Sequence, residues 1–150
     1  MLWEVDVSLR DAAGDHAARE VAAGAEALGI AACSRARTAA GWLIEGDLSR
    51  DDAERLASTL FADPVTESFV VDQIGAARLV EPLDGLPAVV HVLPKAGVTD
   101  PAGLTAQAAA GALGHRVVVR SLRKYWLPPL EAAAIDRLAD KLLANDAIQD

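Results

Sequence analysis

The sequence has little of what several protein classes require. One cysteine, Cys33, among 150 residues excludes a disulfide framework within the chain and fits a reducing compartment, so a cytoplasmic protein is expected. No run of 18 or more apolar residues is present, so no membrane-spanning helix is expected. The acidic N-terminus has no basic leader and does not predict a secretory signal. A net charge of -8 argues against nonspecific nucleic-acid binding, which needs a basic surface.

Aromatic residues are also scarce, at 4% of the chain, whereas 32 residues are alanine. The hydrophobic fraction of 52% is too high for a disordered tail. Because much of that fraction consists of small side chains, the composition predicts a globular protein with a thin core. Composition alone gives no indication of chemistry.

What the sequence does contain is a repeat. Three short segments recur in the same order at shifts of 85, 84 and 82 residues: Ala27-Leu28-Gly29 as Ala112-Leu113-Gly114, Trp42-Leu43 as Trp126-Leu127, and Leu60-Phe61-Ala62-Asp63 as Leu142-Leu143-Ala144-Asn145. Ordered matches at nearly one offset indicate a duplicated unit. The second copy is then slightly shorter than the first.

Periodicity and capping residues predict the elements of each copy. In the first copy, residues 3–9 alternate as a half-buried strand with one wet face, and Asp15 and Gly29 bound a helix. Two strands at about 31–38 and 41–47, with a turn near Ala39-Ala40, precede a helix that starts at Ser49 and a short strand at 69–71. In the second copy the expected elements are a strand at 89–93, a helix from Asp100-Pro101 to Gly114, a strand at 117–127, and a helix after Pro128-Pro129.

These elements predict an α+β protein built from two tandem β-α-β-β-α-β repeats, with antiparallel sheets and helices on one face. Residues 1–73 form the first, degenerate repeat, residues 74–87 a linker rich in glycine and proline, and residues 88–150 the second repeat, whose closing strand is truncated. A unit of about 70 residues is marginal alone. The two repeats are therefore expected to pack together as a pseudo-dimer.

No catalytic constellation is apparent. The three histidines, His16, His91 and His115, are scattered, and Cys33 has no metal-ligand partner nearby in the sequence. The acidic group at Asp47, Asp51, Asp52 and Glu54 is dense enough to suggest a cation site, but three of the four fall in the first turn of a helix, where they complement its dipole. The sequence therefore predicts neither catalytic nor metal-binding residues.

A basic group runs against the acidic trend. Arg120, Arg123 and Lys124 lie on one predicted strand beside Tyr125 and Trp126, and Arg35 and Arg37 occupy the matching strand of the first copy. Three interpretations remain open: a solvated strand face, a surface for an acidic partner, or a site for a small anionic ligand.

Three segments of the second copy resemble the PurS family. They are the stretch from His91 to Pro101 with its Asp-Pro helix start, the segment Arg123-Lys124-Tyr125, and the segment Leu142 to Ile148, which is the most specific. The resemblance covers residues 88–150 well. The first copy is similar only as a degenerate version, because it lacks the Asp-Pro start and the Lys-Tyr pair.

The resemblance implies a function. PurS is a small non-catalytic component of phosphoribosylformylglycinamidine synthase, an ATP- and glutamine-dependent ligase of purine biosynthesis. It joins the glutaminase to the large ATP-using part, and tandem PurS-like units form the N-terminal domain of single-chain synthases. The chain would then be such an N-terminal piece and bind no cofactor itself, the ATP and Mg belonging to the whole synthase. The residues expected to contact partners are Lys95, Arg120, Arg123, Lys124 and Tyr125. PurS-type chains dimerise, so homo-oligomerisation is left open.

Two other functions compete with this one. Tandem ferredoxin-like units also serve as regulatory domains that sense small molecules bound between the copies. An independent enzyme is the least favoured reading, because no nucleophile, metal set or phosphate loop is present.

Overall fold

The computed structural model describes residues 1–30, 35–83, 85–94 and 97–138. Within them lie five strands, β1 (Leu2–Leu9), β2 (Arg37–Gly46), β3 (Glu67–Gln73), β4 (Ala88–Val92) and β5 (Val117–Leu127). The α-helices are α1 (His16–Ala27), α2 (Arg50–Leu56), α3 (Pro101–Ala112) and α4 (Ala132–Leu138). Shorter helical turns are η1 (Ala12–Gly14), the π-helix η2 (Ala57–Phe61) and the 3-10 helix η3 (Ala77–Val80).

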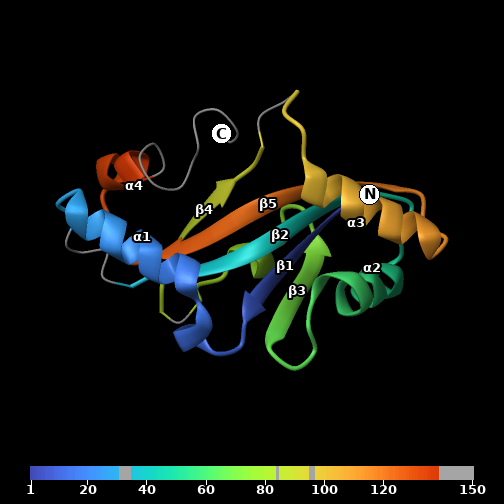
Figure 1. The fold of residues 1–150 in the computed structure, drawn as a ribbon, viewed down its shortest axis with the longest axis horizontal. Coiled ribbons are helices and arrows are strands. Elements are labelled where there is room, and N and C mark those ends of the chain that lie inside the picture. The colour runs from blue at the N-terminus through green and yellow to red at the C-terminus, as the bar shows by residue number, and fades with distance from the viewer. Residues whose placement is uncertain (31–34, 84, 95–96, 139–150) are drawn as a thin grey trace.

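The strands form one antiparallel sheet in the order β3-β1-β2-β5-β4 (Figure 1). Its central ladder joins β2 of the first half to β5 of the second, from Arg37 paired with Trp126 to Gly46 paired with Val117. The α+β prediction with an antiparallel sheet is confirmed. Both halves run strand, helix, strand, helix in the same order, and they share one continuous sheet.

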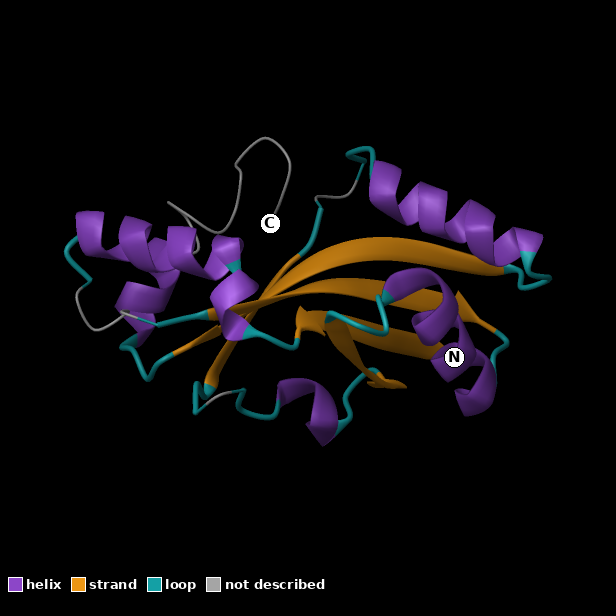
Figure 2. Cartoon of the chain, turned by 60° about the horizontal axis from the view of Figure 1, so that its bottom comes forward, coloured by secondary structure: helices purple, strands orange, loops and turns teal. Residues whose placement is uncertain are grey.

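The four α-helices cover one face of this sheet (Figure 2). Alternate residues of a strand point to opposite faces, so the odd-numbered Trp3, Val5 and Val7 of β1 all enter the core beneath α2, η2 and α3. A second cluster, beneath α1 and α4, gathers side chains of β4 and β5, including Tyr125 and Leu127. The helix layer therefore consists of two groups over opposite ends of the sheet.

The other face is crossed by the described residues between β3 and β4, 74–83 and 85–87, which we call the crossover segment. It leaves β3 at one edge of the sheet and enters β4 at the opposite edge, so it must pass over the whole width. Leu79 of η3 is 4% exposed and Leu86 is 2% exposed, and Leu86 packs on Ala39 and Trp126. The stretch expected as a linker is thus a cover for the second face.

The first helix of each half has the predicted boundaries. Asp15 caps α1, accepting a hydrogen bond from the backbone N–H of Ala18 at 3.0 Å, and Asp100 caps α3 by accepting one from Gly103 at 2.9 Å.

The ends of these helices also match. Gly29 and Gly114 follow them with φ of 80° and 92°, a left-handed conformation that favours glycine. Both helices close with a backbone hydrogen bond to the carbonyl of a fully buried alanine, Ala25 or Ala110. The expected capping box at Ser49 and Asp52 is also present at the start of α2.

The predicted turn at Ala39-Ala40 is wrong. Residues 37–46 are a single strand, in which Ala39 pairs with Lys124 and Ala40 with both Val7 and Arg123. Small side chains are needed here for packing. A Cβ on the adjacent Gly41 would lie 2.3 Å from Cδ1 of Leu122, far inside van der Waals contact. The first half therefore has one long central strand where two were expected, whereas the second half has the single strand predicted at residues 117–127.

The matching of Trp42 with Trp126 is also wrong by one residue. Trp42 faces the helices and stacks on Phe61 with ring centroids 4.9 Å apart, whereas Trp126 faces the crossover segment. A shift of one residue along a strand exchanges the faces. The residue of β5 that matches Trp42 is therefore Tyr125, which also faces the helices.

Several predicted features lie outside the described residues. They are Cys33, Lys95, the segment Leu142 to Ile148, and the truncated closing strand. In the part of the chain that is described, no helix combines the length and apolarity that crossing a membrane requires.

Candidate functional site

The feature that stands out chemically is a buried group of charges centred on Lys124 of β5. Its side chain has no exposed surface and lies beneath the crossover segment. The ammonium Nζ lies 3.0 Å from Oε2 of Glu4 and 2.6 Å from Oδ2 of Asp6, and it donates a further hydrogen bond to the carbonyl oxygen of Leu79. We call these four residues the ionic junction, because they join β1, β5 and the crossover segment.

The junction spans the ladder between the two halves. Lys124 is on β5 and its carboxylate partners are on β1, so its side chain must pass over β2. On this face, the residue of β2 that pairs with Lys124 is the small Ala39, and the neighbouring Gly41 leaves its space to Leu122. The short side chain of Ala39 thus allows the long side chain of Lys124 to reach across β2.

Burial strongly affects the carboxylate of Asp6. It is the largest cause that raises the pKa of Asp6 from 3.8 to about 7, with the hydrogen bond and charge of Glu4 acting in the same direction and Lys124 opposing them. The second oxygen of Asp6, Oδ1, is buried without a hydrogen-bond partner. Asp6 therefore holds a proton far more readily than an exposed aspartate does.

His91 of β4 lies at the margin of the junction. Its Nε2 is 3.9 Å from Oε2 of Glu4, while burial and then the charge of Lys124 lower the pKa of His91 below its usual 6.5. His91 is therefore neutral at pH 7 and contributes little charge to Glu4.

A buried ionic group of this kind contributes more to the specificity of the fold than to its net stability. Desolvating three charged groups offsets most of their attraction, but removing one partner from a buried set costs about 3–5 kcal/mol, since the others stay uncompensated. The junction consequently fixes how β1, β5 and the crossover segment meet.

The sequence did not identify the acidic part of this junction. The alternation of Glu4 and Asp6 with apolar residues predicted a wet strand face, yet Glu4 is 4% and Asp6 5% exposed. The covering crossover segment is distant in sequence, and its hydrophobic residues Leu79, Leu83 and Leu86 were the only available signal.

The expected partner-binding residues do not form one surface. Strand alternation places Arg123 and Tyr125 on the helix face and Arg120 and Lys124 on the other. Arg120 and Arg123 are exposed, but Lys124 and Tyr125 are buried within this chain, so a single cationic surface containing all four is ruled out. Lys95, the fifth, lies outside the described residues.

Arg123 and Tyr125 interact with each other. The guanidinium of Arg123 lies 5.8 Å from the centre of the Tyr125 ring, a cation–π arrangement. Burial is the main cause that raises the pKa of the Tyr125 phenol above 10.0. Tyr125 is therefore a neutral core residue over which Arg123 lies.

The acidic group near α2 serves the helix. Asp52 accepts a hydrogen bond from the backbone N–H of Ser49 in the capping box, and the Ser49 hydroxyl and backbone lower its pKa. Among the described residues, no three histidine, cysteine, aspartate or glutamate side chains gather as a metal-ligand set.

Both halves contain the same polar clamp between helix and strand. Asp15 accepts hydrogen bonds from the backbone N–H of Thr38 at 2.8 Å and from its hydroxyl at 2.7 Å. Asp100 does the same for Ser121, at 2.8 Å and 2.7 Å. One carboxylate thus caps a helix and ties it to the following strand in each half.

Comparison with known families accounts for one of these halves. Residues 87–150 match the family described as "PurS: Phosphoribosylformylglycinamidine (FGAM) synthase". The second half of the chain is PurS-like. This match links it to FGAM synthase, an enzyme of purine biosynthesis, and to a family whose members are non-catalytic subunits. No curated protein matches the chain.

The PurS-like half contains β4, α3, β5 and α4, and therefore Lys124 and the Asp100 clamp. Glu4, Asp6 and the Asp15 clamp belong to the residues before it. The ionic junction consequently connects the PurS-like half to a part of the chain that the family match does not cover.

Proposed function

We propose that this chain is a non-catalytic assembly module of FGAM synthase, made of two tandem PurS-like repeats. The observation that carries the proposal is the family match over residues 87–150. PurS is a component of an ATP- and glutamine-dependent ligase, so the module would bridge the glutaminase and the ATP-using part. It would work in the cytoplasm and bind neither ATP nor Mg itself.

The matched clamps support a duplication that includes residues 1–73. Asp15 with Thr38 and Asp100 with Ser121 make the same three hydrogen bonds, in elements of the same order. The helix ends at Gly29 and Gly114 agree in the same way. The first half therefore keeps the aspartate of the helix start although it lacks the proline.

The sheet order supports a pseudo-dimer. Reading outward from the central ladder, β2 is followed by β1 in one half and β5 is followed by β4 in the other, as a twofold axis between β2 and β5 would require. The ladder and the ionic junction hold the two halves in one body. A rigid body of this kind suits a part that fixes two other proteins relative to each other.

Reconstitution tests the proposal. The full chain is added to the purified glutaminase and ATP-using parts of FGAM synthase, and glutamine-dependent product formation and complex size are measured. We expect the chain to be required for both. With ammonium chloride in place of glutamine, the ATP-using part should need the module much less, since no transfer between sites is involved. Equal glutamine-dependent activity without the chain contradicts the assembly role.

A second candidate, a small-molecule-sensing domain, is favoured by one hollow. A cavity of about 420 Å³ between η2 and α3 is lined mainly by apolar side chains, including Trp42, Leu60 and Phe61. Calorimetry of the chain against amino acids and nucleotides separates the two functions. Micromolar binding in this panel favours sensing, and no binding leaves assembly as the function.

A further inference from the structure

Each half has a groove between its first helix and its second strand, beside the polar clamp. The groove of the first half has about 160 Å³ and is lined by Asp15, Ala18, Arg19, Ala22, Arg35, Ala36 and Arg37. That of the second half has about 500 Å³, and its lining includes Asp100, Leu104, Gln107, Val118, Val119 and Arg120. The two grooves occupy matching places, yet they differ in size and chemistry.

Counting from the clamps shows which residues differ. Arg19 lies four residues after Asp15, and Leu104 lies four residues after Asp100. Likewise, Arg35 and Val118 each lie three residues before the clamp residue on the strand. Two exposed arginines of the first groove are thus replaced by Leu104 and Val118, which remain 57% and 53% exposed. Exposed apolar side chains facing one hollow are typical of a binding surface.

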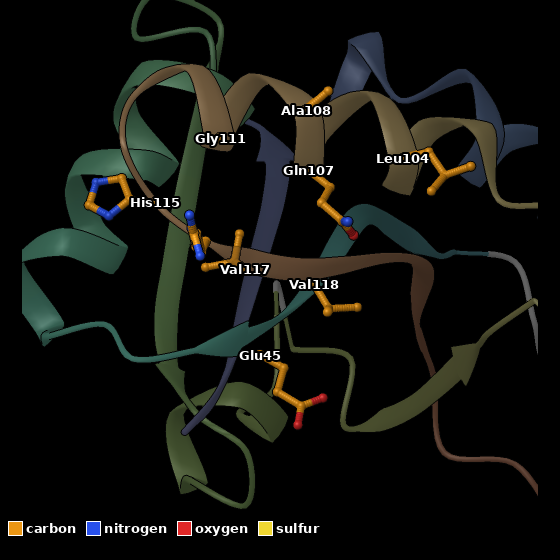
Figure 3. A pocket seen from close by; sticks show the side chains of 9 residues that line it. Glu45, Leu104, Gln107, Ala108, Gly111, His115, Val117 and Val118 are labelled. Atoms are coloured by element: carbon orange, nitrogen blue, oxygen red, sulfur yellow. The ribbon is translucent and has the colours of Figure 1, made fainter.

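The apolar groove extends along α3 beyond these two side chains. A further hollow of about 500 Å³ shares Leu104, Gln107 and Val118 with it and continues to Gly111 and His115. Figure 3 shows this hollow, with Leu104 and Gln107 on α3 on one side and Val118 and Glu45 on the strands on the other. We call the joined hollows the α3 groove.

The α3 groove does not accept an added strand. β4 pairs only with residues 123–127 of β5, so the outer edge of residues 117–122 carries no strand among the described residues. Side chains of the helix layer occupy that edge. Gln107 Oε1 accepts a hydrogen bond from the backbone N–H of Val119 at 3.1 Å, and Asp100 accepts one from the backbone N–H of Ser121. A Cβ on Gly103 would lie 2.7 Å from the Val119 carbonyl oxygen, so α3 sits tightly on the edge. An occupant must therefore contact side chains.

Charge indicates the chemistry of that occupant. Arg116 and Arg120 are exposed and lie two residues on either side of Val118, on the same face of β5. The Asp100 carboxylate beside the groove is directed inward to the clamp. Glu45, opposite Val118, is the acidic side chain of the lining, so the rim is basic on both sides of Val118 in a chain of net charge -8.

We infer that the α3 groove is the docking surface for a protein segment of the synthase that presents an apolar side chain flanked by carboxylates. The apolar side chain packs at the outer edge of β5, against Leu104 on α3 and against Val118, which points to the other face of the sheet, and the carboxylates pair with Arg116 and Arg120. The inference rests on the proposed function, since the synthase parts are the partners. The groove of the first half, with arginines at both apolar positions, does not bind this segment.

The test converts the second groove into the first. The double variant Leu104→Arg/Val118→Arg places at each apolar position the residue found in the other half. Both side chains are more than half exposed, so the variant should unfold at the same temperature as the wild type. We expect its affinity for the ATP-using and glutaminase parts, measured by calorimetry, to fall at least tenfold. The control, Val65→Arg, changes a valine that is 79% exposed and lies outside both grooves, and it should bind normally.

Charge reversal supplies a second variant. Arg116→Glu/Arg120→Glu should weaken assembly more strongly at low salt than at high salt, because exposed ion pairs are screened. If the wild-type chain does not assemble with the synthase parts, the proposed function fails. If the wild type assembles and both double variants bind equally well, the docking surface alone is overturned. Sedimentation that shows a dimer of this chain, lost in Leu104→Arg/Val118→Arg while assembly is unchanged, also overturns it in favour of self-association.

Discussion

The two halves of the chain are alike in the contacts that stabilise each half and differ in the contacts between the halves. Both use an aspartate clamp and a glycine after the first helix. At the central ladder the similarity ends: Lys124 lies three residues after the clamp residue Ser121, whereas Gly41 lies three after Thr38. At Gly41 the missing side chain leaves space for Leu122 of β5, whereas Lys124 pairs with the small Ala39 and reaches across β2.

The two halves have therefore specialised for each other. Two identical halves would place two lysines, or two glycines, on the same face of the ladder. The observed pair places one ammonium against two carboxylates of β1. Divergence therefore concentrates at the junction and the grooves, where two copies in one chain can change independently.

The largest expected effect follows from removing the cation. Lys124→Met should lower the free energy of unfolding by about 3–5 kcal/mol, because Glu4 and Asp6 stay buried without their partner. Urea denaturation measures the change. The triple variant that adds Glu4→Gln and Asp6→Asn should recover a large part of the loss. A Lys124→Met protein as stable as the wild type would show that the junction is not the contact that joins the halves.

Gly41, beside Leu122 at the central ladder, is the next residue to test. Gly41→Ala should destabilise the chain by about 1–3 kcal/mol, since the added Cβ would overlap Leu122 in a filled core. Gly111→Ala is the matched control: nothing lies within 4 Å of a Cβ there, so alanine should stabilise α3 by up to about 1 kcal/mol. Thermal unfolding distinguishes the two. Similar effects from both substitutions would contradict a packing role for Gly41.

The clamps test the similarity between the halves. Asp15→Ala and Asp100→Ala should each cost about 1–2 kcal/mol, because each removes a helix cap and leaves strand hydrogen bonds unmade. Urea denaturation of the two variants should give nearly equal losses. A loss confined to Asp100→Ala would mean that only the PurS-like half depends on its clamp.

A further test concerns pH. The pKa of Asp6 is raised to about 7, so between about pH 4 and pH 7 the folded state holds a proton that the unfolded state has released. The free energy of unfolding must then fall as pH rises through this window, with a slope that corresponds to at most one bound proton. The Asp6→Asn variant lacks this contribution, and subtracting its pH profile from that of the wild type isolates it. A difference that is flat from pH 4 to pH 7 would contradict the raised pKa.

Local features could be predicted from the sequence better than contacts between residues far apart in the chain. Capping aspartates, the glycines after helices and the alternating strand of residues 3–9 follow from short-range chemistry, and these were predicted correctly. The small residues Ala39 to Gly41 were misleading, because short side chains favour both turns and close packing. The local pattern does not distinguish them.

The ionic junction could not be predicted from the sequence for a related reason. Lys124 and Asp6 are 118 residues apart, and their contact depends on a sheet order and a covering segment that no short window encodes. The sequence predicts Arg120 and Lys124 as one basic group, but Lys124 is buried and Arg120 is exposed, because the crossover segment covers only Lys124. Which charge is buried is decided by tertiary structure.

The crossover segment also determines how readily the two halves associate. Its 14 residues need to span four inter-strand spacings, roughly 19 Å, so the chain is easily long enough and the surplus is folded into η3. Such a short tether makes the meeting of the halves a unimolecular event with a millimolar effective concentration. Pairing should then be insensitive to dilution, unlike the association of two separate subunits, and each molecule should carry one half of each kind.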